Sequence, residues 1–241
     1  MTGAIPARWS TAGTTPSPAS RPIWPGTCGM PDLRGMVLAA GHGTRLAPVT
    51  DYVAKPLLPY LGRTLLDRAC DALLAGGCGR VVVNAHHRAH QVAGHVDARD
   101  DRERFRVSLE PEILGTAGGL ARARDAGLLS LDRPTVIANG KLVTDIDLGR
   151  ALDAHRASGA SVTLVLRPNP HREAFTTVRV EAGRVVGFGP SRVPEGPAPL
   201  AFTGVHVLEP EVLRRAEPRF SDTVRDLYPP EIAAGRVLAH V

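Results

Sequence analysis

Apolar and polar positions along the chain follow two patterns, one typical of buried strands and one typical of amphipathic helices. Short continuous apolar runs, bounded by glycine or polar residues, indicate strands that are buried on both faces. In the first half of the chain such runs predict buried strands at residues 36–40 and 80–84, and further strands are predicted at residues 105–110 and 135–138. Between them, helix-forming segments with periodic apolar positions predict helices over residues 64–74, 90–96, 117–126 and 148–157.

The order of these elements predicts the fold class. Thr64 and Asp147 stand where two of the helices begin, and their side-chain oxygens can cap the first turn. Strand and helix alternate, which predicts an α/β fold with a Rossmann-like, mostly parallel sheet flanked by helices on both faces. Shorter strands then follow one another around a hairpin turn at residues 181–183, so we expect a smaller β-rich lobe. These strands are predicted at residues 161–166, 176–180, 185–188 and 202–207.

The first 33 residues differ in composition from everything that follows. They are rich in Pro, Gly, Ala, Ser and Thr, they show no periodicity, and they contain both tryptophans, Trp9 and Trp24. Such a segment buries too little apolar surface to offset the entropy lost on ordering. We therefore predict a disordered tail over residues 1–33 and a folded domain over residues 34–241.

Charge and cysteine content exclude several classes of protein. The formal net charge is +5, but basic residues are spread along the chain and mixed with acidic ones, which favours a solvated surface over a nucleic-acid site. Three cysteines without a Cys-x-x-Cys pair argue against a disulfide framework and a zinc ribbon. No apolar run approaches the roughly 18 residues of a membrane span, and no secretory signal is evident. We therefore expect a cytoplasmic protein.

A glycine loop follows the first predicted strand. Gly41 and Gly43 allow the backbone to turn sharply with its N–H groups free, and such groups form a nest for an anion. Arg45 adds a planar charged fork that can bind two phosphate oxygens. The loop alone is weak support for phosphate binding. Leu46 occupies the third glycine position of the dinucleotide fingerprint, and no Gly-Lys-Ser/Thr follows, so neither an NAD site nor a P-loop is present.

Two further motifs make the loop more specific. Lys55-Pro56-Leu57-Leu58-Pro59 follows after a short interval, and Gly115-Thr116-Ala117-Gly118-Gly119-Leu120 opens a predicted helix. Together with the run from Met36 to Thr50, they resemble the sugar-phosphate nucleotidyltransferase family, in particular its bacterial branch acting on mannose 1-phosphate or N-acetylmuramate 1-phosphate. The family signature reads Leu-Ala-Ala-Gly-x-Gly-Thr-Arg-Leu-x-Pro-x-Thr and then Lys-Pro-Leu-x-Pro.

The resemblance implies an activity and a set of site residues. Members join a nucleoside triphosphate to a sugar 1-phosphate, giving a nucleotide sugar and pyrophosphate. It implies that Arg45 and Lys55 are catalytic, reaching the phosphates and the attacking group. It implies nucleotide binding by Leu38, Ala40, Gly41, Gly43, Thr44, Glu110, Gly115 and Asn139. The carboxylate of Glu110 would hold the base and suits guanine better than uracil. The alternatives are a surface salt bridge for Arg45, a solvated loop lysine for Lys55 and a solvent-facing acid for Glu110.

The sequence departs from the family at its metal site. The family's Asn-Gly-Asp, whose aspartate binds Mg²⁺, reads Asn139-Gly140-Lys141 here, and the family's C-terminal aspartate motif is absent. Mg²⁺ is thus expected from the resemblance, but its ligands are not found, and we expect the fold to be cut short at its C-terminus. Asp147 is explained as a helix cap, with Asp145 as its neighbour. A non-catalytic nucleotide-binding or regulatory module is therefore an alternative to an active enzyme.

Two other sequence features bear on the site. Lys55 and Lys141 are the only lysines among 29 basic residues, and both fall at motif positions. The histidines His86, His87, His90 and His95 cluster in sequence, but no cysteine or Glu-x-x-His arrangement accompanies them, which argues against a metal site. His42, inside the glycine loop, is interpreted as an exposed residue.

Overall fold

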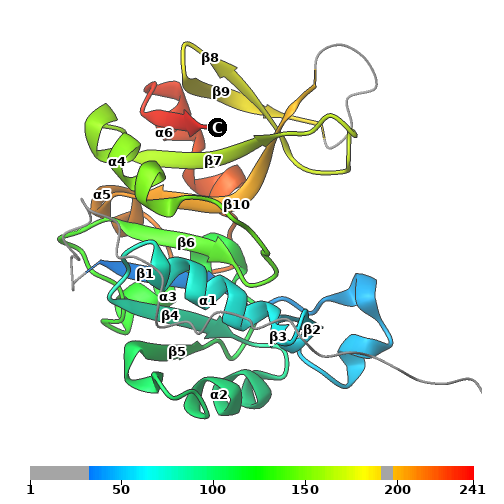
Figure 1. The fold of residues 1–241 in the computed structure, drawn as a ribbon. Coiled ribbons are helices and arrows are strands. Elements are labelled where there is room, and N and C mark those ends of the chain that lie inside the picture. The colour runs from blue at the N-terminus through cyan, green and yellow to red at the C-terminus, as the bar shows by residue number, and fades with distance from the viewer. Residues whose placement is uncertain (1–32, 191–197) are drawn as a thin grey trace, which may run out of the picture.

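The computed structural model describes residues 33–190 and 198–241. The predicted tail lies outside these residues except for Leu33, which is buried in the core. The described chain forms a nine-stranded sheet with helices on both faces (Figure 1). Each helix in these two segments is too short or too polar to cross a lipid bilayer.

The sheet has a parallel half and a mixed half. Its strand order is β5-β4-β1-β6-β10-β7-β11-β9-β8, and β2 and β3 form a separate two-stranded ribbon. The strands of the large sheet are β1 (Arg34–Leu38), β4 (Arg80–Ala85), β5 (Phe105–Leu109), β6 (Thr135–Asn139), β7 (Val162–Pro168), β8 (Thr177–Glu181), β9 (Arg184–Gly189), β10 (Leu200–Leu208) and β11 (Val237–His240). The ribbon consists of β2 (Pro59–Tyr60) and β3 (Arg63–Thr64).

The prediction of a mostly parallel sheet holds for the half formed by β5, β4, β1 and β6, which are all parallel. The other half is mixed, because β10 runs antiparallel to both β6 and β7, while β11 lies parallel to β7. The strands of the expected β-rich lobe are therefore part of the same continuous sheet. They end in the β8–β9 hairpin at the edge opposite β5 (Figure 1). The hairpin turn is where it was predicted, at Ala182 and Gly183, which both have positive φ.

Two hydrophobic cores cover the two faces of the sheet. Successive strand residues point to opposite faces, so that Met36 belongs to one core and Val37 to the other. The core that contains Val37 packs under α1 (Leu65–Ala75), α2 (Ala89–Asp97) and α4 (Leu148–Ser158). The core that contains Met36 packs under α3 (Gly115–Asp125), α5 (Pro210–Arg214) and α6 (Pro229–Ala233). The prediction of helices on both faces is confirmed.

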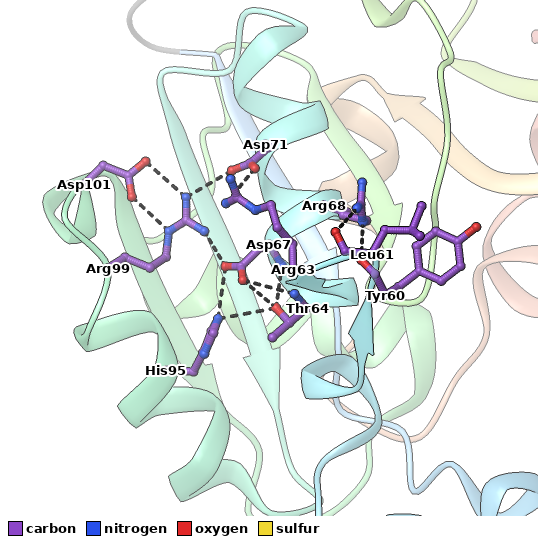
Figure 2. A network of polar contacts seen from close by, with 10 residues as sticks. All are labelled: Tyr60, Leu61, Arg63, Thr64, Asp67, Arg68, Asp71, His95, Arg99 and Asp101. Atoms are coloured by element: carbon purple, nitrogen blue, oxygen red, sulfur yellow. Dashed lines mark hydrogen bonds and ion pairs between the residues drawn. The ribbon is translucent and has the colours of Figure 1, made fainter. Parts of the chain in front are cut away.

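The predicted caps of α1 and α4 are confirmed. Thr64 and Asp67 form a capping box at the start of α1, and Asp147 accepts a hydrogen bond from the N–H of Arg150 at the start of α4. Asp67 also accepts from Arg99, which lies just beyond α2, at 2.6 Å. Figure 2 shows the Arg99 guanidinium among three carboxylates, those of Asp67, Asp71 and Asp101. This partly buried network joins the start of α1 to the end of α2.

Candidate functional site

A cavity of about 280 Å³ lies at the carboxyl ends of the parallel strands, where the segments after β1, β5 and β6 meet. Eight of the residues singled out in the sequence line it: Leu38, Ala40, Gly41, Gly43, Lys55, Gly115, Asn139 and Lys141. Six further residues complete the lining: Ala39, Pro56, Asn84, Ile113, Thr116 and Gly140. Of the remaining predicted site residues, Thr44 and Arg45 are exposed on a short 3-10 turn, η2 (Thr44–Leu46), directly after the glycine loop.

Strand register brings residues from distant motifs together. Leu38, the last residue of β1, is paired with Asn84 in β4 on one side and with Asn139 in β6 on the other. Because parallel strands end at the same edge, these three paired residues lie together, and all three line the cavity. Room for the Asn139 side chain comes from Gly204 in β10, where an added Cβ would lie 2.0 Å from Asn139 Nδ2.

The two glycines of the loop have different roles. Gly43 has a φ of +71°, and a Cβ there would lie 3.0 Å from both Lys55 Cβ and Thr50 Cγ2. The turn at Gly43 therefore requires glycine, whereas Gly41 has no left-handed φ and nothing within 4 Å of an added Cβ. The expected sharp turn is thus made by Gly43 alone. Gly41 leaves open space at the cavity wall, which allows a ligand to approach the backbone closely.

A buried chain of hydrogen bonds supports the first residue of the loop. The N–H of Ala39 donates to Asn84 Oδ1 at 2.6 Å, and Asn84 Nδ2 donates to Glu110 Oε1 at 2.6 Å. The other carboxylate oxygen of Glu110 accepts from the N–H of Leu114 at 3.2 Å. Burial raises the pKa of Glu110, while the hydrogen bonds from Asn84 and Leu114 act in the opposite direction. Asn84 lines the cavity, and Glu110 lies behind it with both carboxylate oxygens engaged.

Close packing explains the glycines at the start of α3. Gly115 has a φ of +72°, and its added Cβ would lie 2.4 Å from the backbone oxygen of Ser221. At Gly119, a Cβ would lie 2.7 Å from Glu110 Oε1 and 2.8 Å from Asn84 Nδ2. Thr116 lines the cavity and accepts a hydrogen bond from the N–H of Thr223 at 2.8 Å. The motif therefore lets α3 lie against both the Asn84–Glu110 pair and the segment around residue 221.

Lys55 is placed by a backbone segment that is attached to α2. The amide of Gln91 bridges this segment: its Oε1 accepts from the N–H of Ala54 at 2.8 Å, and its Nε2 donates to the oxygen of Tyr52 at 2.8 Å. Lys55 then begins the 3-10 turn η4 (Lys55–Leu57), with Pro56 at its second position. Sequence patterns did not identify Gln91, because its partners are backbone groups about 40 residues away.

The charged residues that line the cavity are both cations. Burial, then the charge of Lys141, then the charge of Arg45, lower the pKa of Lys55. These three cations are therefore close enough to interact, although they come from three separate loops. Among the described lining residues there is no carboxylate. This arrangement favours an anionic ligand with several charges.

The residues at this site do not fit a divalent metal. The described parts of the chain contain no group of three or more His, Cys, Asp or Glu side chains arranged to hold an ion. Asp147 caps α4, as predicted, and Asp145 is exposed. The rings of His86 and His87 lie 5.5 Å and 5.2 Å from that of His42, so these three histidines cluster beside the glycine loop. His86 and His87 each hydrogen-bond to a backbone carbonyl, and the absence of a histidine metal site stays a prediction.

Comparisons with known proteins agree with this geometry. The family model described as nucleotidyl transferase matches residues 34–241. A UTP–glucose-1-phosphate uridylyltransferase of Synechocystis is 29% identical over 75% of the chain, and a mannose-1-phosphate guanylyltransferase catalytic subunit of Danio rerio is 26% identical over 86%. The chain spans 50% and 58% of the length of these two relatives.

A solved structure shows the same fold. It is described as a candidate glucose-1-phosphate thymidylyltransferase from Bacillus anthracis in complex with sucrose, and it superposes with a TM-score of 0.70 at 18% identity. The match covers 86% of each chain. Together with the match of the family model to nearly all the described residues, this establishes that the chain belongs to the nucleotidyl transferase family.

Proposed function

We propose that the cavity binds a nucleoside triphosphate, and that the chain carries the nucleotide-binding part of an enzyme that transfers a nucleotidyl group to a sugar 1-phosphate. The observation that carries this proposal is the presence of Lys55 and Lys141 in the lining of one cavity beside the glycine loop, with Arg45 close enough to lower the pKa of Lys55. Both relatives named above are described as transferases acting on a sugar 1-phosphate, which supports the same class of reaction.

The reaction needs positioning more than covalent help from the protein. An oxygen of the sugar 1-phosphate forms a bond to the α-phosphorus, the bond from that phosphorus to the β-bridging oxygen breaks, and pyrophosphate leaves. Lys55 and Arg45 would neutralise the phosphate oxygens, and the backbone at Gly41 and Gly43 would approach them closely. Mg²⁺, when bound in this family, would supply further charge neutralisation. Within the described parts of the chain, no carboxylate lines this cavity to hold it.

The base side of the cavity is assigned to Asn84 and Gly115. Both line the cavity, whereas the carboxylate of Glu110 is occupied by Asn84 and the N–H of Leu114. The predicted contact of Glu110 with the base becomes, in this proposal, an indirect one. Glu110 fixes the amide of Asn84, and Asn84 retains one amide hydrogen that can reach a base carbonyl.

Pyrophosphate release tests the proposed reaction. The full chain is incubated with each nucleoside triphosphate and a panel of sugar 1-phosphates, with Mg²⁺ varied from zero. Activity with a preferred pair supports nucleotidyl transfer, and loss of that activity in Lys55→Ala assigns it to this cavity. Absence of binding to every triphosphate, measured by calorimetry, contradicts the proposal.

A second candidate function is a nucleotide-binding module without turnover. It is favoured by Lys141 and by the absence of carboxylates among the described lining residues. Tight binding of a triphosphate or a nucleotide sugar, without release of pyrophosphate from any pair, would distinguish this module from the enzyme.

A further inference from the structure

The position of Lys141 is set by the sheet and not by a free loop. Gly140 donates its N–H to the backbone oxygen of Leu38 at 2.9 Å, so the turn after β6 is joined to the end of β1. A Cβ at Gly140 would lie 3.0 Å from that oxygen and 3.1 Å from Val37 Cγ1. The backbone of Lys141 is therefore held beside the glycine loop. Lys141 lines the cavity, and its charge lowers the pKa of Lys55.

The charge of this cavity opposes a divalent cation. Lys55 and Lys141 line it, Arg45 lies close enough to lower the pKa of Lys55, and no described carboxylate lines the cavity to balance them. A divalent ion would enter a positive potential, and among the described lining residues it would find amide, carbonyl and hydroxyl oxygens but no carboxylate. Mg²⁺ binds nucleotide sites through one or two carboxylates in addition to phosphate oxygens, and that part of the coordination is missing.

We propose that this cavity binds the polyphosphate chain of its ligand without a divalent cation, with the Lys141 ammonium placed where it neutralises the phosphates instead. This rests on the proposed function only in that the polyphosphate belongs to a nucleotide. Free triphosphate carries about two more negative charges than its Mg²⁺ complex, so it is the better ligand for three cations. Added Mg²⁺ should therefore weaken binding, because it sequesters the free triphosphate.

An ammonium group in place of a metal ion should also affect turnover. A fixed ammonium carries one charge and donates hydrogen bonds, but it has no open coordination positions for the attacking and leaving oxygens. The unaltered protein should thus retain its ligand tightly while releasing pyrophosphate slowly or not at all. Lys141→Asp should make binding depend on Mg²⁺.

The test measures affinity by calorimetry for GTP, UTP and inorganic tripolyphosphate, at constant ionic strength, in EDTA and in 5 mM Mg²⁺. In the unaltered protein, we expect affinity to fall about tenfold when Mg²⁺ is added. Lys141→Gln should weaken tripolyphosphate binding in EDTA by about tenfold to a hundredfold. Lys141→Arg should keep the preference for free triphosphate. Arg150→Gln is the matched control, because Arg150 is highly exposed on α4 and does not line the cavity.

The outcomes separate this inference from the proposed function. Nucleotide binding that is strengthened by Mg²⁺ in the unaltered protein overturns the inference and leaves the proposed function standing. An equal affinity of Lys141→Gln and the unaltered protein for tripolyphosphate also overturns it. Binding of tripolyphosphate that depends on Lys141, without binding of any nucleotide, supports the inference and refutes the proposed function.

Discussion

Asn84→Asp probes the buried support of the glycine loop with almost no change in side-chain shape. The substitution preserves the oxygen that accepts from the N–H of Ala39, but it replaces the donor that faces Glu110 with a second carboxylate oxygen. The lost hydrogen bond from Asn84 to the carboxylate of Glu110 should lower the free energy of unfolding by about 1.5–3 kcal/mol. At the present separation of 2.6 Å, two full charges with an effective dielectric constant of about 20 would repel by roughly 6 kcal/mol.

Protonation limits this repulsion. Adding a proton to a carboxyl with an ordinary pKa costs about 3.5 kcal/mol at pH 7 and about 1 kcal/mol at pH 5. Because the repulsion exceeds both values, the buried pair in Asn84→Asp should share a proton, and its pKa is raised above the unfolded value. A folded state that binds the extra proton gains stability as pH falls. Between pH 7 and pH 5, the free energy of unfolding of the variant should therefore rise by about 2.5 kcal/mol relative to that of the unaltered protein.

The assay is urea unfolding of both proteins at pH 7, 6 and 5. The double variant Asn84→Asp/Glu110→Gln is the matched control, because the new amide at position 110 can donate to the new carboxylate at position 84. It should restore most of the stability at pH 7 and remove the recovery on acidification. A deficit in Asn84→Asp that is the same at pH 7 and pH 5, or a double variant no more stable than the single one, would refute the reasoning.

Three further predictions concern the phosphate site, α3 and acid stability. Arg45→Ala and Lys55→Ala should each weaken triphosphate binding about tenfold to a hundredfold in calorimetry and leave binding of the bare nucleoside nearly unchanged; equal losses for both ligands would contradict the phosphate assignment. Gly115→Ala should lower the free energy of unfolding in urea by roughly 2–4 kcal/mol, because its positive φ and the close contact at its Cβ both cause strain. The control Gly127→Ala has open space at its Cβ, so it should lose only the roughly 1–2 kcal/mol that comes from the positive φ. Burial lowers the pKa of His206 to about 3, so the unfolded state binds more protons and stability should fall as pH drops below about 6.5, by up to about 1.4 kcal/mol per pH unit. His206→Leu should reduce that slope, and an unchanged slope would exclude His206 as its source.

Hydrophobic periodicity predicted the elements of the first half because their signals are long and regular. The residues of β1, β4 and β6 are mostly buried and apolar, β5 alternates apolar and polar residues, and α1 and α4 have capping side chains that the structure confirms. The missed elements are short: α5 and α6 have five residues each, and β11 has four. Segments of that length contain too few repeats for periodicity to be recognised, and β11 is held as a strand by its neighbours β7 and β9. The mixture of parallel and antiparallel strands also depends on pairing across the sheet, because β10 lies between β6 and β7 and runs antiparallel to both.

The site was predictable to the extent that its residues lie in contiguous motifs. Gly43, Lys55 and Gly115 carry local signals, and all three line the cavity. Asn84 and Gln91 carry none, because their partners are distant in sequence and become neighbours only after folding. One signal for Asn84 was present: it is a polar residue between the apolar residues Val83 and Ala85 of a buried strand, which is unusual unless the amide is satisfied in the core.

A substitution at residue 141 can change the charge of this cavity without disturbing the fold. The structural demands fall on backbone groups and small residues: Gly140 must approach Leu38, Gly43 must approach Lys55, and Asn84 must receive the N–H of Ala39. Lys141 takes part in none of these contacts, since it is exposed at the cavity wall and follows the last residue that the sheet constrains. A carboxylate or an ammonium is therefore equally compatible with the fold at that position. Under the proposal made above, the identity of residue 141 selects between a ligand that arrives with a metal ion and one that arrives without it.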